Sequence, residues 1–573
     1  MSTILILYPV LPVQANIKTP VNVDAPSIAP TPSIPPIAQQ TLPRTNPNDD
    51  RLLPSTIPEE LLKKQPQERL EIEKSPTPEL DVESADPNLI IDVSKIVVEG
   101  NTIISDEDIA TITQPLEGKP VRLKELQGVA NEMTRRYVEA GYLTTQAVLG
   151  NQVIEAGMVT ISVIEGALPT IEIEGNGRLK ESYIRDRIQL GLNKPLNTTK
   201  LEENLRLLSF DPLFKEVKGS LKPGKDPGET RLAVQVKRQK PWSLNLGIDN
   251  YSVPSIAPER AGATFTYRNL TGLGDYATAS YYTGLNLGDF DRAALNQYSF
   301  GYGVPLNAMN GTLQFRADIN NRKITDPALA ALNIEGNSEL YELSYRQPVI
   351  RTLREEFALS VGFAIQEGET LISPPFLDTR DRNRVLSLGQ DYLRRDPQGF
   401  WSARSQFNLG LDIFDASAGS FFSWSGQAQR VQRLGNDFLL IMQGELQLTP
   451  DTLPSFYDFV IGGGQSLRGY RQNARSGDNG YRLSIEGRIL VLRNSQKEPT
   501  LQLAPFFDVG QVWNTGNDRV FENFLAGVGI GVLWEPFPRF NLRLDYGHPI
   551  IGITEGTRSL QDEAIYFSVS YSP

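Results

Sequence analysis

The feature that most constrains this chain is an alternation of apolar and polar residues that fills its C-terminal half. The alternation starts near Trp242 and continues to Tyr571 in a chain of 573 residues. Successive side chains of a β-strand point to opposite faces, so each run has one apolar and one polar face. Many runs end in aromatic residues, as strands do at a membrane surface. We therefore expect residues 240–573 to form a transmembrane β-barrel with lipid outside and a polar lumen.

The runs number about sixteen, an even number as bacterial outer-membrane barrels require. The clearest are Trp242–Ile248, Arg260–Asn269, Asp275–Gly284, Glu339–Arg346, Gly480–Leu490 and Ala564–Tyr571. The others begin near Gln297, Thr312, Glu356, Arg384, Ser402, Phe421, Phe438, Leu501, Leu525 and Phe540. Short connections such as Asn269–Asp275 alternate with long ones such as Asn320–Asn337 and Glu367–Thr379. We expect the short turns to face the periplasm and the long loops to face outward.

Composition excludes several classes of protein. The chain has no Cys and a single His, His548, which excludes disulfides, thiolate catalysis and the usual zinc sites. A net charge of −12 argues against a general nucleic-acid binder. No Walker loop, GxSxG elbow or His-based cluster is present. We therefore expect neither an enzyme nor a cofactor or metal site. No stretch approaches the roughly 20 apolar residues of a spanning helix.

The N-terminal part has no pattern typical of a core. Residues 1–15 hold a short apolar stretch without a positive n-region, and we interpret them as a degraded or mis-started signal segment. Residues 16–90 form a Pro-rich leader that we expect to be disordered. Within it, residues 58–73 suit a short amphipathic helix, although Pro66 would kink it.

Between the leader and the barrel, one order of elements occurs twice. In residues 91–166 the order is strand, helix, helix, strand, strand, with a helix at Leu123–Ala140 that carries apolar residues at 3–4 spacing. Residues 167–239 repeat that order, with helices near Lys180–Leu190 and Thr199–Leu208. A period of roughly seventy to eighty residues predicts two tandem domains rather than a short-repeat solenoid.

Two motifs in the predicted barrel carry a charge pair. The loop between the eleventh and twelfth runs, about Pro450–Asn479, contains a run of glycines at 462–464, which is followed by Leu467, Arg468, Gly469 and Tyr470. The thirteenth run contains Phe506, Asp508 and Gly510, with Asp508 expected to face the lumen. A buried charge pair is costly to desolvate, which favours a functional role. The alternative is an exposed arginine in a loop that happens to be rich in glycine.

The repeats and the motifs together resemble the TpsB family, the outer-membrane transporters of two-partner secretion. Val97–Thr102, Glu139–Tyr142 and Val163–Gly166 look like a POTRA (polypeptide-transport-associated) domain of the TpsB type, and the second repeat is a weaker copy. In this family the loop arginine folds back into the pore and pairs with the aspartate of the inner wall. The resemblance therefore implies an ion pair between Arg468 and Asp508. Leu467 stands where the family motif usually has Val.

The resemblance also implies a function. Two periplasmic POTRA domains would capture an unfolded TpsA-type exoprotein, and the barrel would pass it across the outer membrane without nucleotide. The leader helix would plug the pore, and the protein would be a monomer in outer-membrane lipid. The alternative is a BamA-type insertase that assembles other barrels, although that type usually carries more POTRA domains. A passive porin is less consistent with the long periplasmic half. The client, and the open or closed state of the pore, stay open at this point.

Overall fold

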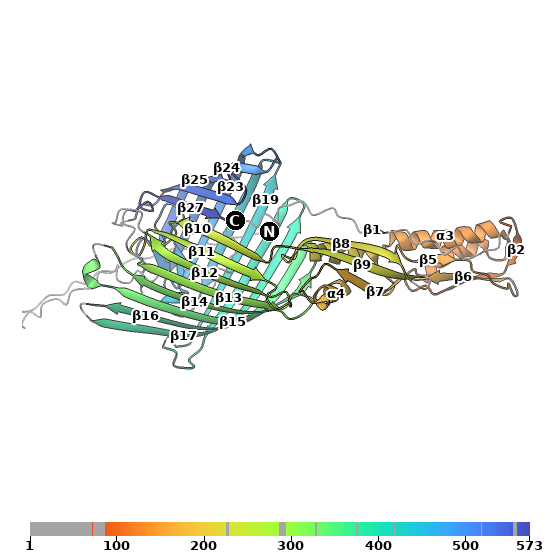
Figure 1. Cartoon of the computed structure of the whole chain (residues 1–573), viewed down its shortest axis with the longest axis horizontal. Helices are drawn as coiled ribbons and strands as arrows, with labels where there is room; N and C mark the ends of the chain where they lie inside the picture. Colours follow the sequence, from red (N-terminus) through yellow and green to blue (C-terminus); the bar gives the residue numbers. More distant parts are fainter. Residues whose placement is uncertain are drawn as a thin grey trace, which may run out of the picture. The chain divides into compact units, whose positions relative to one another are not determined.

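The computed structural model describes residues 71–72, 86–224, 228–285, 294–326, 329–373, 376–417, 419–516, 518–553 and 559–573. The predicted signal segment and most of the leader lie outside these ranges. The described part holds two α/β modules followed by a closed barrel of sixteen antiparallel strands (Figure 1), which confirms the predicted fold class and strand number. None of its helices combines the length and apolarity needed to cross a bilayer.

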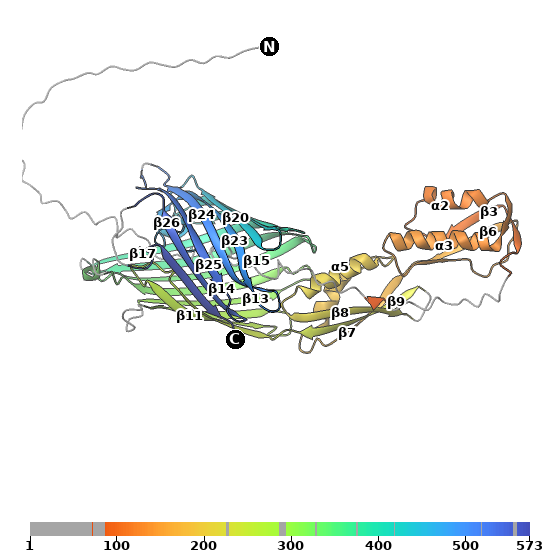
Figure 2. The same cartoon turned by 90° about the horizontal axis from the view of Figure 1, so that it is seen from above.

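The first module packs its long helix on a small sheet. Strands β3 (Lys95–Glu99), β6 (Met158–Ile164) and β5 (Gln146–Val148) form the sheet in that order. Helix α3 (Leu123–Glu139) runs along it (Figure 2). The residues of α3 at 3–4 spacing lie in the core, namely Leu126, Val129, Met133 and Tyr137. The remaining elements are α2 (Asp106–Thr113), the 3₁₀ turn η3 (Gln114–Leu116) and a β2–β4 pair (Ile90–Val93, Lys119–Arg122).

The second module repeats the arrangement with two helices of similar length. It contains β7 (Ala167–Glu174), α4 (Glu181–Gln189), α5 (Thr198–Ser209), β8 (Phe214–Pro223) and β9 (Glu229–Arg238). Its four-stranded sheet has the order β1–β8–β9–β7. Strand β1 is Glu71–Ile72, which pairs in parallel with Ser220 and Leu221.

Strand β1 limits the helix predicted in the leader. The expected helix extended to about residue 73, but Glu71 and Ile72 are in a strand, so that part of the prediction is wrong. Backbone pairing with the edge of β8 overrides the local helical pattern at these two residues. Residues 58–70 lie outside the described residues.

The barrel closes when its last strand pairs with its first. In chain order the strands are β10 (Trp242–Asp249), β11 (Glu259–Arg268), β12 (Tyr276–Leu285), β13 (Leu295–Pro305), β14 (Thr312–Lys323), β15 (Glu335–Arg351), β16 (Glu355–Ile372), β17 (Leu377–Asp396), β18 (Gly399–Gly410), β19 (Phe421–Leu434), β20 (Phe438–Leu448), β23 (Asn479–Arg493), β24 (Pro499–Trp513), β25 (Phe524–Trp534), β26 (Phe540–Pro549) and β27 (Ile565–Tyr571). The closing pair joins Leu246–Asp249 of β10 to Ser568–Tyr571 of β27. This ladder of four residue pairs closes the cylinder, and Trp242–Asn245 at the start of β10 extend beyond it.

The predicted alternation divides the two faces of the wall. On β14, Asp318 and Asn320 are buried on the lumen side, whereas Phe315 lies on the opposite face and is exposed. Tyr281 and Tyr298, directly opposite in register on β12 and β13, form a tilted pair on that outer face. Aromatic and aliphatic side chains facing out and polar ones facing in are what a lipid-embedded barrel requires.

One predicted loop is mostly strand. Residues Glu367–Thr379 were expected to connect two strands, but β16 extends to Ile372 and β17 begins at Leu377. Cross-strand ion pairs hold this hairpin, with 2.8 Å from Arg380 to Glu369 and 2.8 Å from Arg384 to Glu367. Charged residues replace the apolar alternation here, so the segment has the composition of a loop while the backbone ladder continues.

The second module contacts the short β11–β12 turn. The Lys180 amide donates to the Gly272 carbonyl at 2.9 Å, and an Arg178 guanidinium nitrogen donates to the Leu270 carbonyl at 3.1 Å. This short turn therefore lies on the side of the second module, where the sequence predicted the short turns to be.

The core of the first module gives a stability prediction. Leu126 is completely buried, so Leu126→Ala should lower the free energy of unfolding of this module by about 2–5 kcal/mol. Val138→Ala on the exposed side of the same helix should change it by less than about 0.5 kcal/mol. Urea-dependent proteolysis of the detergent-solubilised protein measures both values, because the barrel remains folded. Equal effects of the two substitutions would contradict this packing.

Candidate functional site: the loop-six anchor

The longest described connection of the barrel folds back against the lumen wall. This segment, residues 449–478 between β20 and β23, is called loop six below. It contains the turn η5 (Ser455–Tyr457) and the short strands β21 (Phe459–Ile461) and β22 (Arg475–Gly477), which pair with each other. Gly462 and Gly463 have φ values of +109° and +104°, which side chains rarely allow. These two glycines let the chain reverse directly after β21.

Arg468 is held by Asp508 of β24 through three hydrogen bonds. Nε of Arg468 donates to Oδ2 of Asp508 at 2.7 Å, and Nη2 donates to Oδ1 at 2.8 Å. The Arg468 backbone amide also donates to Oδ2 at 3.0 Å. The side chains are 6% and 1% exposed. The structure therefore brings the two predicted residues into a bidentate, buried contact, the strongest geometry for this pair.

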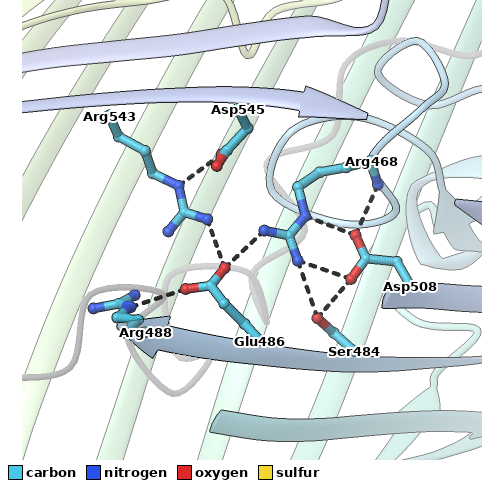
Figure 3. Close-up of polar contacts among 7 residues, drawn as sticks. All are labelled: Arg468, Ser484, Glu486, Arg488, Asp508, Arg543 and Asp545. Atoms are coloured by element: carbon cyan, nitrogen blue, oxygen red, sulfur yellow. Dashed lines mark hydrogen bonds and ion pairs between the residues drawn. The ribbon is translucent and has the colours of Figure 1, made fainter. Parts of the chain in front are cut away.

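Four more residues complete the network around this pair (Figure 3). Nη1 of Arg468 donates to Glu486 of β23 at 2.7 Å, and Glu486 also accepts from Arg543 at 2.6 Å and Arg488 at 2.9 Å. Arg543 donates in turn to Asp545 at 2.7 Å. Three arginines and three carboxylates thus balance in charge. Such a balance of charge is what a buried ionic cluster requires.

Ser484 and Phe506 hold the remaining faces of the Arg468–Asp508 pair. The Ser484 hydroxyl donates to Oδ1 of Asp508 at 2.7 Å, and Arg468 donates to the same hydroxyl at 3.3 Å. The guanidinium carbon of Arg468 lies 3.4 Å from the ring centroid of Phe506. A guanidinium over an aromatic face gains cation–π attraction, which increases when water is excluded. The Phe506 ring therefore helps to hold the Arg468 guanidinium through contact with one face of its plane.

The residues on either side of Arg468 fix the loop backbone. Leu467 is completely buried in a small apolar cluster with Ile461, Val512 and Leu525. Gly469 has φ +105°, and its amide donates to the Tyr566 hydroxyl of β27 at 2.9 Å.

Tyr470 ties the loop to the backbone of the wall. The Tyr470 hydroxyl lies 2.8 Å from the carbonyl of Ala526 and 2.8 Å from that of Ile551. The Tyr566 hydroxyl, which accepts from Gly469, donates to the Tyr470 carbonyl at 2.6 Å. All four residues of the loop motif therefore contact the wall.

Wall glycines make room for the loop. A Cβ on Gly527 of β25 would lie 2.0 Å from the Arg468 carbonyl oxygen, and one on Gly547 of β26 would lie 2.6 Å from the Gly469 nitrogen. A Cβ on Gly510 would lie 3.2 Å from the Leu467 side chain. These three glycines form a trough, defined here as Gly510, Gly527 and Gly547, into which the loop backbone fits.

Sequence reasoning found seven residues of this site and missed the others. Leu467, Arg468, Gly469, Tyr470, Phe506, Asp508 and Gly510 all lie in the anchor. Glu486, Ser484, Arg543, Asp545, Tyr566 and the trough residues Gly527 and Gly547 were not singled out. The spacing Gly527-x-Gly529-x-Gly531 places glycines on one face of a strand and could have indicated the trough. Glu486 has no such signal, because only the register of β23 with β24 places it near Arg468.

Two further ion pairs attach loop six to neighbouring loops. Arg471 pairs with Asp562, which precedes β27, and Arg475 pairs with Glu522, which precedes β25. Both arginine side chains are mostly buried, at 14% and 13% exposed. Among the described residues, no group of three or more His, Asp and Glu side chains is arranged to hold a metal ion. The contacts of loop six with the wall thus consist of ion pairs, aromatic packing and close backbone approach.

The trough gives a prediction that does not depend on charge. Gly527→Ala should displace loop six, because overpacking of this kind costs about 1–3 kcal/mol and should raise the undocked fraction by about five- to 150-fold. Trypsin cleavage after Arg468, Arg471 and Arg475 in the purified protein measures undocking. Gly301→Ala is the matched control, since it lies on the same lumen face with its nearest neighbour 4.0 Å from the added Cβ. Equal cleavage of the two variants would contradict the tight fit.

Comparisons with known proteins match this architecture. A sequence model of the family described as haemolysin secretion/activation protein ShlB/FhaC/HecB matches residues 228–533, and a model of the ShlB-type POTRA domain matches residues 91–166. The haemolysin transporter protein HpmB of Proteus mirabilis is 23% identical over 488 residues, covering 80% of this chain and 81% of that protein.

Two solved structures share the fold. That of CdiB from Escherichia coli has a TM-score of 0.65 at 20% identity and covers 87% of this chain and 92% of that one. That of BamA from Haemophilus ducreyi, lacking POTRA domains 1–3, has a lower TM-score of 0.52 at 17% identity and covers 84% and 100%. The family match, rather than the shared fold, distinguishes the two readings that the sequence left open. The chain belongs to the ShlB/FhaC/HecB haemolysin secretion/activation protein family and is an outer-membrane transporter of two-partner secretion with its POTRA domains in the periplasm.

Proposed function

We propose that the Arg468–Asp508 contact locks loop six inside the lumen and that export of the client protein depends on this lock. The observation that carries the proposal is the bidentate contact between two side chains that are 6% and 1% exposed. Burying one of these charges without the other would cost free energy. The buried Asp508 carboxylate therefore favours the position of loop six in which Arg468 contacts it. The lock gives loop six a defined resting place from which it can be released and recovered.

The client binds first at the edges of the POTRA sheets. In the first module β3 and β5 are edge strands, and an extended peptide can add to such an edge through backbone hydrogen bonds that ignore sequence. The second module supports this mode, because Glu71 and Ile72 of the leader already add to the edge of β8 as a parallel strand. The same edge geometry suits an unfolded chain, which has backbone groups to pair and no tertiary structure.

The client itself is a secreted exoprotein of the TpsA type. The named relatives support this assignment, since HpmB is a haemolysin transporter. The client crosses the barrel as an extended chain and folds outside, where folding prevents its return. Transport requires neither nucleotide nor a catalytic step, and the transporter acts as a monomer in outer-membrane lipid.

The leader closes the resting pore. Arg322, Gln366 and Asn383 are buried on the lumen side of the wall and carry polar atoms for which the described chain supplies no hydrogen-bond partner. Buried polar groups normally find partners, so these three favour an occupant of the lumen. We propose that the occupant is the helix predicted in residues 58–70, which is polar on one face.

The lock predicts a loss of secretion without a loss of the barrel. Arg468→Ala should abolish secretion because it leaves the buried Asp508 carboxylate without its cationic partner, and Asp508→Ala should do so because it leaves Arg468 with Glu486 alone. Breaking a buried ion pair in this way costs about 3–5 kcal/mol. Arg468→Lys should also fail, since a point charge cannot make the bidentate contact. The exoprotein in the medium is measured beside the heat-modifiable mobility of the folded barrel.

Arg493→Ala is the control for those three substitutions, because Arg493 pairs with an exposed Asp437 at a short turn. Its secretion should equal that of the unchanged protein. Normal secretion by both Arg468→Ala and Asp508→Ala would refute the lock.

The leader gives a separate prediction. Deletion of residues 16–70 should raise the ion conductance of the purified protein in planar bilayers, because the polar lumen loses its occupant. Deletion of residues 16–57, which keeps the predicted helix, should leave the conductance low. If both deletions conduct like the full chain, the leader does not close the pore.

A further inference from the structure

A cavity of about 370 Å³ lies between the second POTRA domain and the first strands of the barrel. Its walls come from the residues just before α4, from the connection between α5 and β8, from the end of β9 with the connection to β10, and from the end of β11 with the following turn. The side chains used below are Arg178, Arg238, Lys240, Tyr267 and Arg268. The volume is that of a small-molecule site.

Cationic side chains line this cavity without any acidic one. Arg178, Arg238, Lys240 and Arg268 all line it, and no Asp or Glu does. None of the four forms an ion pair with a described carboxylate, in a chain whose net charge is −12. Four cationic side chains around one partly open cavity create a local positive potential that attracts an anion.

The existing contacts of these side chains leave donors free. Arg178 donates one guanidinium nitrogen to the Leu270 carbonyl, and Arg268 donates one to the Ser243 hydroxyl at 3.4 Å. A Cβ on Gly177, which has φ +59°, would lie 2.5 Å from the guanidinium carbon of Arg238. The glycine therefore allows the guanidinium to lie against the backbone at the cavity wall. A guanidinium has five donors, so most remain for a bound oxyanion.

An aromatic, lipid-facing patch adjoins the cations. Trp242 of β10 and Tyr267 of β11 are directly opposite in register, on the face away from the lumen. Trp242 is 38% exposed and stacks on Phe265 with 6.4 Å between ring centroids. The Lys240 ammonium lies 3.4 Å from the Trp242 ring centroid. Trp and Tyr at strand ends with a neighbouring Lys mark the level of lipid head groups.

The two halves of the site select an amphiphile. The cationic cavity suits a phosphate group, and the apolar strand face beside it, with Phe265 and Leu246 both more than 40% exposed, suits an acyl chain. A free phosphate would use only the first half. Basic pockets at the membrane surface are the sites at which proteins bind anionic lipid head groups.

We propose that this cavity binds the phosphate-bearing head group of an anionic phospholipid from the periplasmic leaflet, with the acyl chains lying on the outer face of β10 and β11. The bound lipid would join the POTRA domain, the connecting segment and the barrel wall at the membrane surface. This site is independent of the loop-six lock, which lies on other strands.

Quenching of Trp242 fluorescence tests the proposal in the full chain. Trp401, Trp424, Trp513 and Trp534 are replaced by Phe, which leaves Trp242 of the 5 tryptophans. The protein is placed in phosphatidylcholine vesicles that contain brominated phosphatidylglycerol or brominated phosphatidylcholine. Phosphatidylglycerol should associate at Trp242 at least about tenfold more strongly, since each cation at the surface adds to the attraction.

Two double variants that remove the same charge show whether the preference for phosphatidylglycerol depends on the cavity. Arg238→Gln with Lys240→Gln should lower that preference by about tenfold. Lys215→Gln with Lys222→Gln on β8 removes the same charge from the same domain, without lining the cavity, and should leave the preference unchanged. Heat-modifiable mobility shows that each variant is folded.

Three results would overturn the proposal. The first is equal quenching of Trp242 fluorescence by the two brominated lipids in the protein that keeps Arg238 and Lys240. The second is an equal loss of preference in both double variants. The third is displacement of phosphatidylglycerol by millimolar inorganic phosphate or glycerol phosphate, which would identify a site for a free anion instead.

Discussion

The interaction on which the barrel interior depends is the contact between the guanidinium of Arg468 and the carboxylate of Asp508. Each of these groups would be costly to bury alone, and their attraction compensates only when the hydrogen bonds are complete. Glu486, Ser484 and the Phe506 ring complete them, and Arg543 and Arg488 in turn compensate Glu486 (Figure 3). The docked position of the loop therefore depends on the register of β23, β24 and β26.

The ion pairs alone do not determine the position of loop six, because its backbone also has to come close to the backbone of the barrel wall. The trough of Gly510, Gly527 and Gly547 lets the Arg468 and Gly469 backbone approach the wall closely. Glycine in a strand interior normally weakens it, since there is no side chain to pack. Here the loop itself fills the space that the missing side chains leave. The wall and the loop thus stabilise each other through this close packing.

Much of this arrangement could be predicted from the chain alone. The period of two and the number of runs predicted the sixteen-stranded barrel, because side-chain alternation follows directly from strand geometry. The helical spacing of Leu126, Val129 and Met133 predicted the face of α3 that packs into the core. Arg468 and Asp508 could be paired only through the family resemblance, since 40 residues separate them.

The remainder depends on tertiary register, which the local pattern does not contain. Glu486 lies on β23 and Arg543 on β26, and these two strands flank β24 and β25 in the barrel. No local sequence pattern predicts that the two side chains meet. The β16–β17 hairpin was missed because charged pairs replace apolar alternation where the strands continue. Glu71 and Ile72 form a strand because an open edge accepts them, although their own neighbours favour a helix.

The balanced charge of the network has one more consequence when loop six withdraws. Arg468 then departs from the lumen wall and leaves Arg488 and Arg543 facing Glu486, Asp508 and Asp545. The vacated wall carries one excess negative charge, which favours any guanidinium or ammonium group that comes near. The returning loop brings that group in the right geometry, so re-docking proceeds downhill. In the cycle proposed for loop six, this residual negative charge favours the return of the Arg468 guanidinium to its place on the wall.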